Sequence, residues 1–388
     1  MIVVIADDFT GAAELGGIGL QFGLTVEVNT EVNVHSTAGL LIVATDTRSL
    51  KIKQALAIME QVTRQVALLK PRLVFKKVDS VLRGHVVPEL MVHLGLLNRI
   101  GAILAPANPA LGRTISNGHY FINGQPLHLS GFATDPDFPA KTSSLQEMLG
   151  QGNVPLIIQQ VNEPLKHAGI IVAEAETDAD LQDWAAKADE GWLLAGGSGF
   201  FSAVLKNKYG EPKELLKREP DYQETPLLMV CGTTFFKSVE TIAALKRKGG
   251  WVSYMPEAIV RETDPAGNLF DGWCNEIVFF AKTFGKAIIA VDADMAERWS
   301  VNPDNIRAKI SVVVKKVLAQ IAIKELLIEG GSTAFAVLKH INCTKFYPVE
   351  EISPGVIRMI MAGRDGQRLT IKPGSYSWPP HIHETNLQ

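Results

Sequence analysis

The sequence predicts an α/β protein of two domains, each a largely parallel sheet flanked by helices, with an active-site cleft between them. Two observations support this fold class. Short apolar runs alternate with amphipathic stretches along most of the 388 residues, as expected for parallel strands covered by helices. A charged segment with two prolines, residues 207–225, interrupts the alternation, which is typical of a domain boundary. We therefore expect an N-terminal domain over residues 1–210 and a C-terminal domain over residues 226–380.

In the N-terminal domain, continuous apolar runs predict buried strands and the amphipathic runs between them predict helices. Strands are expected at Ile2–Ala6, Gly39–Ala44, Leu73–Lys77, Ala102–Ala105, Val154–Gln159, Gly169–Ala173 and Trp192–Leu194. Helices are expected at Ala12–Phe22, Ile52–Leu69 and Val86–Asn98. From Gly112 to Pro139 the helical periodicity is lost, and Asn123-Gly124 predicts the turn of a β-hairpin.

The same alternation resumes in the C-terminal domain. Strands are expected at Leu227–Val230, Trp251–Met255, Ala287–Val291 and Glu325–Ile328, and helices near Val239–Lys248 and at Ile306–Ile323. The two domains are thus predicted to have the same class of fold.

Composition argues against several classes of partner. The formal net charge is −3 and 20% of residues are charged, which does not suggest a nucleic acid or a membrane surface as partner. No apolar stretch reaches the roughly 18 residues of a membrane span, and the N-terminus lacks the pattern of a signal peptide. We expect a cytoplasmic protein with small-molecule partners. The sequence leaves the oligomeric state open, a homo-oligomer included.

Cysteines and histidines form no recognisable metal or disulfide pattern. Cys231, Cys274 and Cys343 are far apart and odd in number, so each is expected to be a small buried hydrophobe. His381 and His383 lie two residues apart without a recognisable metal-ligand set of carboxylates or cysteines, and we interpret them as part of a solvated tail. The sequence assigns no metal ligand.

Charged residues follow three apolar strands of the N-terminal domain. Asp7 and Asp8 end the first run, Asp46 follows the second, and the segment 76–84, "KKVDSVLRG", contains the end of the third. Each aspartate alone is as readily explained as a helix cap. Because the carboxyl ends of parallel strands form one edge of a sheet, the three clusters together favour a ligand site there. Carboxylates accept hydrogen bonds from hydroxyls and Arg or Lys binds a carboxylate, so a polyhydroxylated acid fits this site.

The C-terminal domain has glycine-rich turns between strand and helix. "EGGST" places Gly330 and Gly331 before Ser332 and Thr333, and "CGTT" gives a second such turn at residues 231–234. Helix N-termini preceded by glycine bind phosphates, although GxxxxGK[ST] is absent. These turns predict a nucleotide site. A third turn, Gly196–Leu205, is interpreted as a packing turn.

Several motifs together carry a family resemblance. "ADDFTGA" (6–12), "DTRS" (46–49), "KKVDSVLRG" (76–84), "GRT" with "NGHY" (112–120) and "TDPDFP" (134–139) occur in this order. The chain resembles the four-carbon acid sugar kinase family, and the resemblance covers nearly the whole sequence. "GGST" (330–333) and "PGV" (354–356) look like the nucleotide-binding half of that family.

The resemblance implies ATP-dependent phosphorylation of threonate, erythronate or 3-oxo-tetronate, with Mg²⁺ expected beside the nucleotide. It also implies an N-terminal acid-sugar-binding domain and a C-terminal nucleotide-binding domain. The expected site residues are catalytic Asp8 and Asp79, and substrate-binding Asp7, Asp46, Arg48, Lys77, Ser80, Arg83 and Gly84. Those expected to bind ATP are Thr233, Thr234, Gly330, Gly331, Ser332, Thr333, Gly355 and Gly374.

The adjacent aspartates are expected to have different tasks. Two neighbouring carboxylates are not both stable as anions, so one should have a raised pKa or be held by donors. We expect Asp7 to cap the following helix and Asp8 to be the general base. Asp79 is the alternative candidate for the general base, and Lys77 and Arg83 are expected to lower its pKa. Arg83 is expected to pair with the substrate carboxylate.

Departures from the family pattern keep other functions open. Val81 stands where threonine is usual, Ser332 where the family has Glu in G-G-E-T, and Pro373 lies in the segment that usually reads K-S-G-N-F-G. A sugar-acid sensor with a degraded nucleotide site is the first alternative. A dehydrogenase is less favoured, because the first turn lacks GxGxxG and its acidic groups would repel a pyrophosphate. The sequence leaves open which four-carbon acid, which stereoisomer and which hydroxyl are used.

Overall fold

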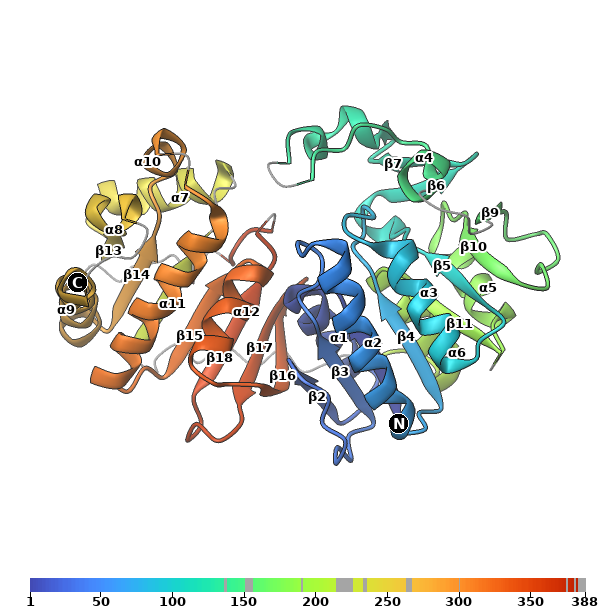
Figure 1. Cartoon of the computed structure of the whole chain (residues 1–388), viewed down its shortest axis with the longest axis horizontal. Helices are drawn as coiled ribbons and strands as arrows, with labels where there is room; N and C mark the ends of the chain where they lie inside the picture. Colours follow the sequence, from blue (N-terminus) through green and yellow to red (C-terminus); the bar gives the residue numbers. More distant parts are fainter. Residues whose placement is uncertain are drawn as a thin grey trace. The chain divides into compact units, whose positions relative to one another are not determined.

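The computed structural model describes residues 1–135, 138–150, 156–189, 191–213, 226–232, 236–262, 267–299, 301–374, 376–379 and 382 (Figure 1). The chain divides into two compact units, Met1–Leu215 and Leu216–Gln388. The charged segment predicted as a domain boundary contains this division, and residues 214–225 of it lie outside the described residues.

A parallel sheet forms the centre of the first unit. Its strands lie in the order β2-β3-β1-β4-β11-β5-β10-β9, and each neighbouring pair is parallel. Their bounds are β1 Ile2–Ala6, β2 Val26–Asn29, β3 Leu40–Ala44, β4 Leu73–Lys77, β5 Gly101–Ala105, β9 Leu156–Gln159, β10 Gly169–Ala173 and β11 Trp192–Gly196. β1 and β3 are buried along their whole length, which explains why they read as continuous apolar runs.

Helices flank this sheet in two groups. α1 and α5 both pack against α6, whereas α2 packs against α3. Their bounds are α1 Phe9–Gln21, α2 Ile52–Leu68, α3 Val86–Leu97, α4 Leu145–Leu149, α5 Asp178–Lys187 and α6 Ser198–Tyr209. The turn into α6 is tightly packed, because a Cβ on Gly196 would lie 2.2 Å from the Ala105 carbonyl oxygen. This supports its interpretation as a packing turn.

A small antiparallel sheet lies between β5 and α4 in the sequence. It contains β6 (Arg113–Ser116), β7 (His119–Ile122) and β8 (Gln125–Pro126). Asn123 and Gly124 both have positive φ between β7 and β8, as the type I′ turn of a hairpin requires. The predicted hairpin is therefore confirmed. Short helical turns follow it, among them η3 (Gly131–Thr134).

The second unit has a mixed sheet. Strands β13-β14-β12-β15-β18 lie in this order and are parallel, and β17 and β16 continue the sheet in antiparallel pairing. The strand bounds are β12 Leu227–Cys231, β13 Val252–Tyr254, β14 Lys286–Ala290, β15 Glu325–Glu329, β16 Lys345–Ser353, β17 Val356–Met361 and β18 Arg368–Lys372. The helix bounds are α7 Phe236–Arg247, α8 Glu257–Arg261, α9 Gly267–Phe284, α10 Ala293–Arg298, α11 Pro303–Gln320 and α12 Gly331–His340.

The predicted fold class is confirmed, with local differences. Every strand predicted from an apolar run is present, with ends shifted by at most two residues. The prediction omitted the four-residue strand β2 and the helices α4, α5, α8, α9 and α10. It also omitted the strands β16, β17 and β18. β16 is only partly buried, so its polar residues break the apolar run expected of a buried strand.

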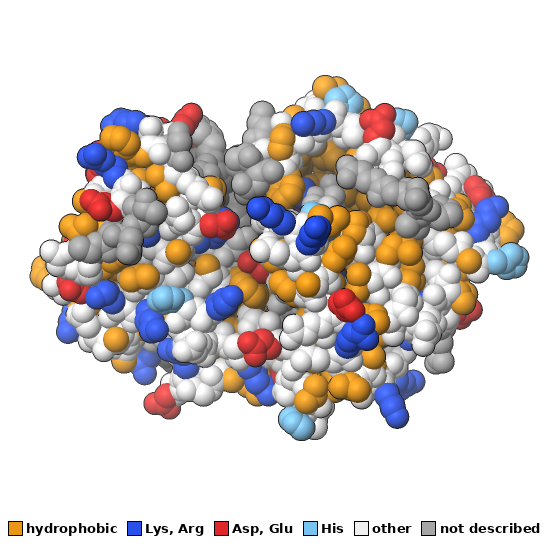
Figure 2. Space-filling model, in the orientation of Figure 1, with side chains coloured by type: hydrophobic (Ala, Val, Ile, Leu, Met, Phe, Trp, Pro, Cys, Tyr) orange, Lys and Arg blue, Asp and Glu red, His pale blue; other side chains and the backbone are white. Residues whose placement is uncertain are grey.

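None of the described helices combines the length and the apolar character needed to cross a membrane. Figure 2 shows Lys and Arg side chains mixed with Asp and Glu side chains over the visible face. This mixture agrees with the small net charge of −3.

An ion pair is buried within the first unit. Lys76 on β4 donates to Glu89 on α3 at 2.6 Å, and both side chains are almost completely buried. His93, one turn further along α3, contacts Thr63 on α2 at 2.7 Å. Burial, together with the charge of Lys76, holds the pKa of His93 well below its ordinary value. The packing of α3 on β4 therefore depends on a charge that is matched inside the contact.

We predict that Glu89→Gln lowers the free energy of unfolding by about 3–5 kcal/mol, because it leaves Lys76 buried without its counter-charge. Urea denaturation followed by circular dichroism measures the change.

The matched control is Glu60→Gln on α2, which breaks the exposed pair between Glu60 and Arg64. It should change stability by less than about 1 kcal/mol. Equal losses in the two variants would mean that the buried pair adds no more than a surface pair.

Candidate functional site

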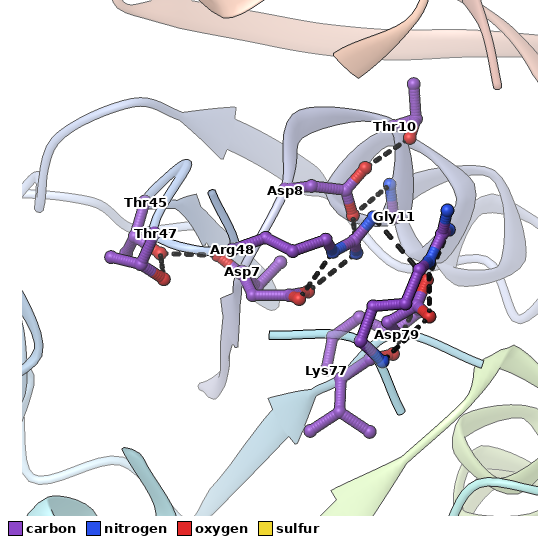
Figure 3. A network of polar contacts seen from close by, with 12 residues as sticks. Asp7, Asp8, Thr10, Gly11, Thr45, Thr47, Arg48, Lys77 and Asp79 are labelled. Atoms are coloured by element: carbon purple, nitrogen blue, oxygen red, sulfur yellow. Dashed lines mark hydrogen bonds and ion pairs between the residues drawn. The ribbon is translucent and has the colours of Figure 1, made fainter. Parts of the chain in front are cut away.

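The ends of three neighbouring strands bring the predicted acidic clusters together. β1 lies between β3 and β4, and Ala6 pairs in register with Ala44 and with Lys77. The residues that follow these strands therefore meet at one edge of the sheet, as Figure 3 shows for Asp7, Asp8, Arg48 and Asp79. The three carboxylates at this edge are buried, with exposed fractions of 3% for Asp7, 6% for Asp8 and 4% for Asp79.

Arg48 joins these carboxylates. Its Nε and Nη2 donate to the two oxygens of Asp7 at 2.8 and 3.0 Å, and Nη2 also donates to Asp8 Oδ1 at 2.7 Å. Its Nη1 lies 3.5 Å from Asp79 Oδ1. Burial lowers the pKa of Arg48, but the three carboxylates outweigh it and raise that pKa well above the ordinary value. Arg48 is thus the shared counter-charge of the cluster.

Asp8 caps the helix that follows it. It is the N-cap of α1 in an extended conformation, and its Oδ1 accepts from the Gly11 amide at 3.2 Å. The Thr10 hydroxyl donates to Asp8 Oδ2. The expectation that Asp7 caps the helix is therefore wrong: α1 begins at Phe9, so the residue directly before it is Asp8. Asp7 instead forms the two-point pair with Arg48.

The environment of Asp8 favours its ionised form. Burial raises the pKa of this carboxyl, but the charges of Arg48 and Lys77 and the hydrogen bond from Thr10 outweigh burial and hold the pKa below its ordinary value. Of the two outcomes expected for the adjacent aspartates, a carboxylate held by donors describes Asp8.

Asp79 is bound on both oxygens. Arg83 donates to it through Nε and Nη2, each at 2.8 Å, and the amides of Val81 and Arg83 donate at 3.1 Å. Burial raises the pKa of Asp79, yet Arg83 and Arg48 together hold it far below the ordinary value, as expected for this alternative candidate. The parallel donors of Arg83 that were expected to bind a substrate carboxylate already hold Asp79, and its Nη1 donates to Asp135 at 2.8 Å.

Lys77 lies beside Asp8 with little exposure. Its side chain is at the end of β4 and Nζ donates to the Val78 carbonyl at 2.8 Å. A Cβ added to Gly11 would lie 2.6 Å from Asp8 Oδ1 and 3.0 Å from Lys77 Nζ. Only glycine at position 11 therefore leaves room for both charged groups. No carboxylate among the described residues lies within 4.0 Å of Lys77 Nζ.

Three further predicted residues surround the cluster. Asp46 has φ of 50° in the turn after β3. Gly84 has φ of 86°, and a Cβ there would lie 3.1 Å from Arg48 Cγ, so this glycine gives the Arg48 side chain its space. Ser80 accepts from Arg113 through its hydroxyl and from Tyr120 through its carbonyl.

Sequence reasoning missed contacts from the hairpin region. Arg113, Tyr120 and Asp135 all reach the loop after β4, and Thr10 and Gly11 complete the surroundings of Asp8. All of these residues fall inside the motifs that carried the family resemblance. The motifs gave a signal for them that apolar periodicity and charge pattern did not give.

In the second unit the predicted turns lie at one edge of the sheet. β12 and β15 are parallel neighbours, with Cys231 opposite Glu329, and β18 follows with Lys372 opposite Glu329. A Cβ on Gly232 would lie 2.7 Å from Thr333 Oγ1, so the first two turns are in contact. Gly355, in the turn before β17, and Gly374, after β18, lie at the same edge because β17 and β18 are antiparallel. Thr233 and Thr234 lie outside the described residues.

The N-terminus of α12 has the character of an anion site. Its N-cap is Gly330, with φ of 92°, and the first turn carries neither a capping side chain nor an acidic residue. The free amides and the helix dipole at such an end favour a phosphate. Gly330, Gly331, Ser332 and Thr333 therefore fit a nucleotide phosphate.

Below this edge lies a buried polar cluster. Glu329 accepts from Lys372 at 2.9 Å, from Trp378 at 3.2 Å and from the Ser238 hydroxyl. A cavity of about 150 Å³ begins beside it. Its lining consists of Cys231, Ser238, Val239, Ile242, Ala243, Tyr254, Ala290, Val291, Asp292 and Asp294. The cavity lies at the carboxyl ends of β12, β13 and β14, where α/β sheets bind ligands.

No group of three or more His, Cys, Asp or Glu side chains among the described residues is arranged to hold a metal ion. Mg²⁺ commonly keeps several waters and binds through substrate phosphates plus one or two carboxylates. His381 and His383 lie outside the described part of the chain. The three cysteines are free and buried, as predicted.

Comparison with known proteins links this site to a family. Residues 2–204 match the family model of a sugar-binding N-terminal domain. D-threonate kinase of Salmonella typhimurium is 31% identical over 252 residues, which are 60% of this chain and 57% of that protein. The chain thus spans just over half of that relative. 3-oxo-tetronate kinase of Haemophilus influenzae is 24% identical over 406 residues, 97% of each chain.

Solved structures share the fold. A protein of Haemophilus influenzae aligns with a TM-score of 0.72 at 19% identity and covers 97% of each chain. A protein of Salmonella typhimurium LT2 aligns with a TM-score of 0.77 at 17% identity and covers 97% of this chain and 96% of its own. The family match extends over more than half of the chain and contains the whole carboxylate cluster. The chain belongs to the four-carbon acid sugar kinase family.

Proposed function

We propose that the protein is an ATP-dependent kinase that phosphorylates a hydroxyl of a four-carbon acid sugar, namely threonate, erythronate or 3-oxo-tetronate. The observation that carries this proposal is the buried cluster of Asp7, Asp8, Arg48, Lys77 and Asp79 inside the sugar-binding domain match. The names of the relatives, D-threonate kinase and 3-oxo-tetronate kinase, support the substrate class.

The first unit is proposed to bind the acid sugar, in a site that involves Asp7, Asp8, Asp46, Arg48, Lys77, Asp79, Ser80, Arg83 and Gly84. A buried carboxylate accepts strongly from a hydroxyl, and a buried ammonium donates to one. Because Arg48 and Arg83 fix the carboxylates at 2.7–3.0 Å, the site needs little rearrangement when a polyol binds. Such preorganisation reduces the entropy lost on binding.

The second unit is proposed to bind ATP. The uncapped N-terminus of α12 would hold phosphates through amides of Gly331, Ser332 and Thr333. Gly355, Gly374, Thr233 and Thr234 are proposed to complete the ATP site. The nucleoside would occupy the cavity beside Cys231 and Tyr254. Bound Mg²⁺ would neutralise phosphate charge. We further propose a cytoplasmic location.

Asp8 is proposed to accept the proton of the acceptor hydroxyl. Among the described residues its Oδ2 accepts one hydrogen bond, from Thr10, and a carboxylate oxygen can accept more than one. Phosphoryl transfer has a loose transition state, so positioning matters more than strong base help. A carboxylate whose pKa lies below the ordinary value can therefore serve. Asp79, held on both oxygens by Arg83, is proposed to orient the cluster.

The proposal predicts ATP consumption with a four-carbon acid. Purified protein with ATP and Mg²⁺ is offered threonate, erythronate and 3-oxo-tetronate in turn, and ADP release and phosphorylated product are measured. Steady turnover with at least one acid supports the kinase.

Other outcomes of this panel separate the alternatives. Binding of an acid without turnover would identify a sensor. A change of nicotinamide absorbance in place of ADP release would identify a dehydrogenase.

For Asp8→Asn we predict a fall of kcat by about 10²–10⁴-fold with little change in KM for ATP, because the substitution keeps the shape and removes the base. Asp79→Asn is the comparison variant. A folded Asp8→Asn enzyme with near wild-type kcat, beside an inactive Asp79→Asn enzyme, would give the role to Asp79.

The pH profile gives a second measurement on the same residue. The lowered pKa of Asp8 keeps it ionised at every pH above its ordinary titration range. Wild-type kcat/KM should therefore show no acid limb from this group above about pH 5. A limb centred near pH 6 would require a different base.

For Gly331→Val we predict that the apparent KM for ATP rises about tenfold or more, because the side chain blocks close approach of phosphate to the helix end. Gly331 lacks a positive φ, so valine introduces no backbone strain there. Gly272→Val on α9, where an added Cβ meets nothing within 4 Å, is the control. Equal KM values for ATP in the two variants would remove α12 from the nucleotide site.

A further inference from the structure

The backbone of Arg113 is fixed at the edge of the sheet that carries the acidic cluster. Its amide donates to the Asn108 carbonyl at 3.0 Å, and the Asn108 amide donates back to the Arg113 carbonyl at 2.8 Å. Gly112, with φ of 66°, makes the tight turn before it. Asn108 follows β5, so Arg113 is anchored to the sheet although it begins the hairpin strand β6.

The side chain of Arg113 reaches the loop that holds Asp79. Its Nη1 donates to the hydroxyl of Ser80, the next residue after Asp79. The guanidinium carbon lies 5.9 Å from the centre of the Phe132 ring, and that of Arg83 lies 5.8 Å from the same ring. Two guanidinium groups therefore contact one aromatic ring beside the candidate substrate site.

The arginines of this region differ in their partners. Arg48 contacts three aspartates, and Arg83 contacts two. For Arg113 the contacts within the described ranges are the Ser80 hydroxyl and the Phe132 ring, and no described carboxylate lies within 4.0 Å. A guanidinium has five N–H donors. Arg113 thus retains several donors and a full charge beside a site already supplied with carboxylates.

We propose that Arg113 binds the carboxylate of the acid sugar and so determines the specificity of the site for acids. The inference rests on the proposed function and names the residue that recognises the acid group. A guanidinium offers two parallel donors that match the two oxygens of a carboxylate. Arg83, first expected in this role from the sequence, orients Asp79 instead.

Lys77 is the other cation near the site without a described carboxylate partner, and its geometry suits a different group. Lys77 is 4% exposed, and its ammonium lies beside Asp8 and Gly11. An ammonium is a point charge without the parallel donors of arginine. Lys77 therefore fits a hydroxyl oxygen near Asp8, while Arg113 holds the acid end of the same short molecule.

The test compares charged and neutral forms of one substrate. Threonate, erythronate and their primary amides are offered to the wild type, Arg113→Gln, Arg113→Lys and the control Arg64→Gln. Arg64 lies on α2 with its side chain 62% exposed. Steady-state kinetics with ATP give kcat/KM, and calorimetry without nucleotide gives the dissociation constant of each compound.

We expect the wild type to prefer acid to amide, and Arg113→Gln to lose most of that preference. Its kcat/KM for the acid should fall about 100-fold, mainly through KM, which is the size expected for a charge-assisted pair in a desolvated site. The kcat/KM of Arg113→Gln for the amide should change by about threefold or less. The preference of Arg113→Lys for the acid should lie between those of the wild type and Arg113→Gln, because lysine keeps the charge and loses the parallel donors. Arg64→Gln should match the wild type.

Other results overturn the inference in distinguishable ways. Equal losses on acid and amide would make Arg113 a structural residue, and no loss would remove it from the site; both leave the kinase proposal standing. If the wild type binds the acids without phosphorylating them, the kinase proposal fails. The ratio of the dissociation constants of amide and acid, measured by calorimetry, then decides alone on the role of Arg113. If the wild type binds none of the compounds, both proposals fail.

Discussion

The first unit depends on one shared guanidinium. Three carboxylates at neighbouring strand ends are almost completely removed from water, which is costly unless each is paired. Arg48 contacts all three, and Gly84 leaves the space for its side chain. Asp8 can then cap α1, and Asp79 can order the loop after β4 through amides of Val81 and Arg83. The site and the local fold thus rest on the same charge balance.

The sequence allowed the strands and the meeting of the acidic clusters to be predicted, because parallel strands buried on both faces read as apolar runs and end at one edge. The helix cap was assigned to Asp7 in place of Asp8, since alternation along a strand does not tell where the next helix starts. α1 begins at Phe9, three residues before its predicted start. The partners of Arg83 depend on Asp135, 52 residues away, and no local pattern in the sequence contains that contact.

In the second unit the same reasoning was less complete. The turns at Gly330 and Gly232 could be predicted because glycine between a strand and a helix has a clear physical purpose. The antiparallel strands could not, since β16 is only partly buried and alternates irregularly. Their pairing with β18 nevertheless determines where Gly355 and Gly374 lie. Ser332 leaves the first turn of α12 without an acidic side chain, so the departure from G-G-E-T is compatible with an anion at this helix end.

The contacts between the hairpin region and the loop after β4 have a consequence for local motion. Arg113 and Tyr120 bind Ser80, and Asp135 binds Arg83. Segments joined by several partly buried hydrogen bonds open together, as one cooperative unit with a single opening free energy. The hairpin is therefore not an independent flap. Amides of the loop and of β6 and β7 should therefore show the same opening free energy in hydrogen exchange, so a ligand held by either segment protects both.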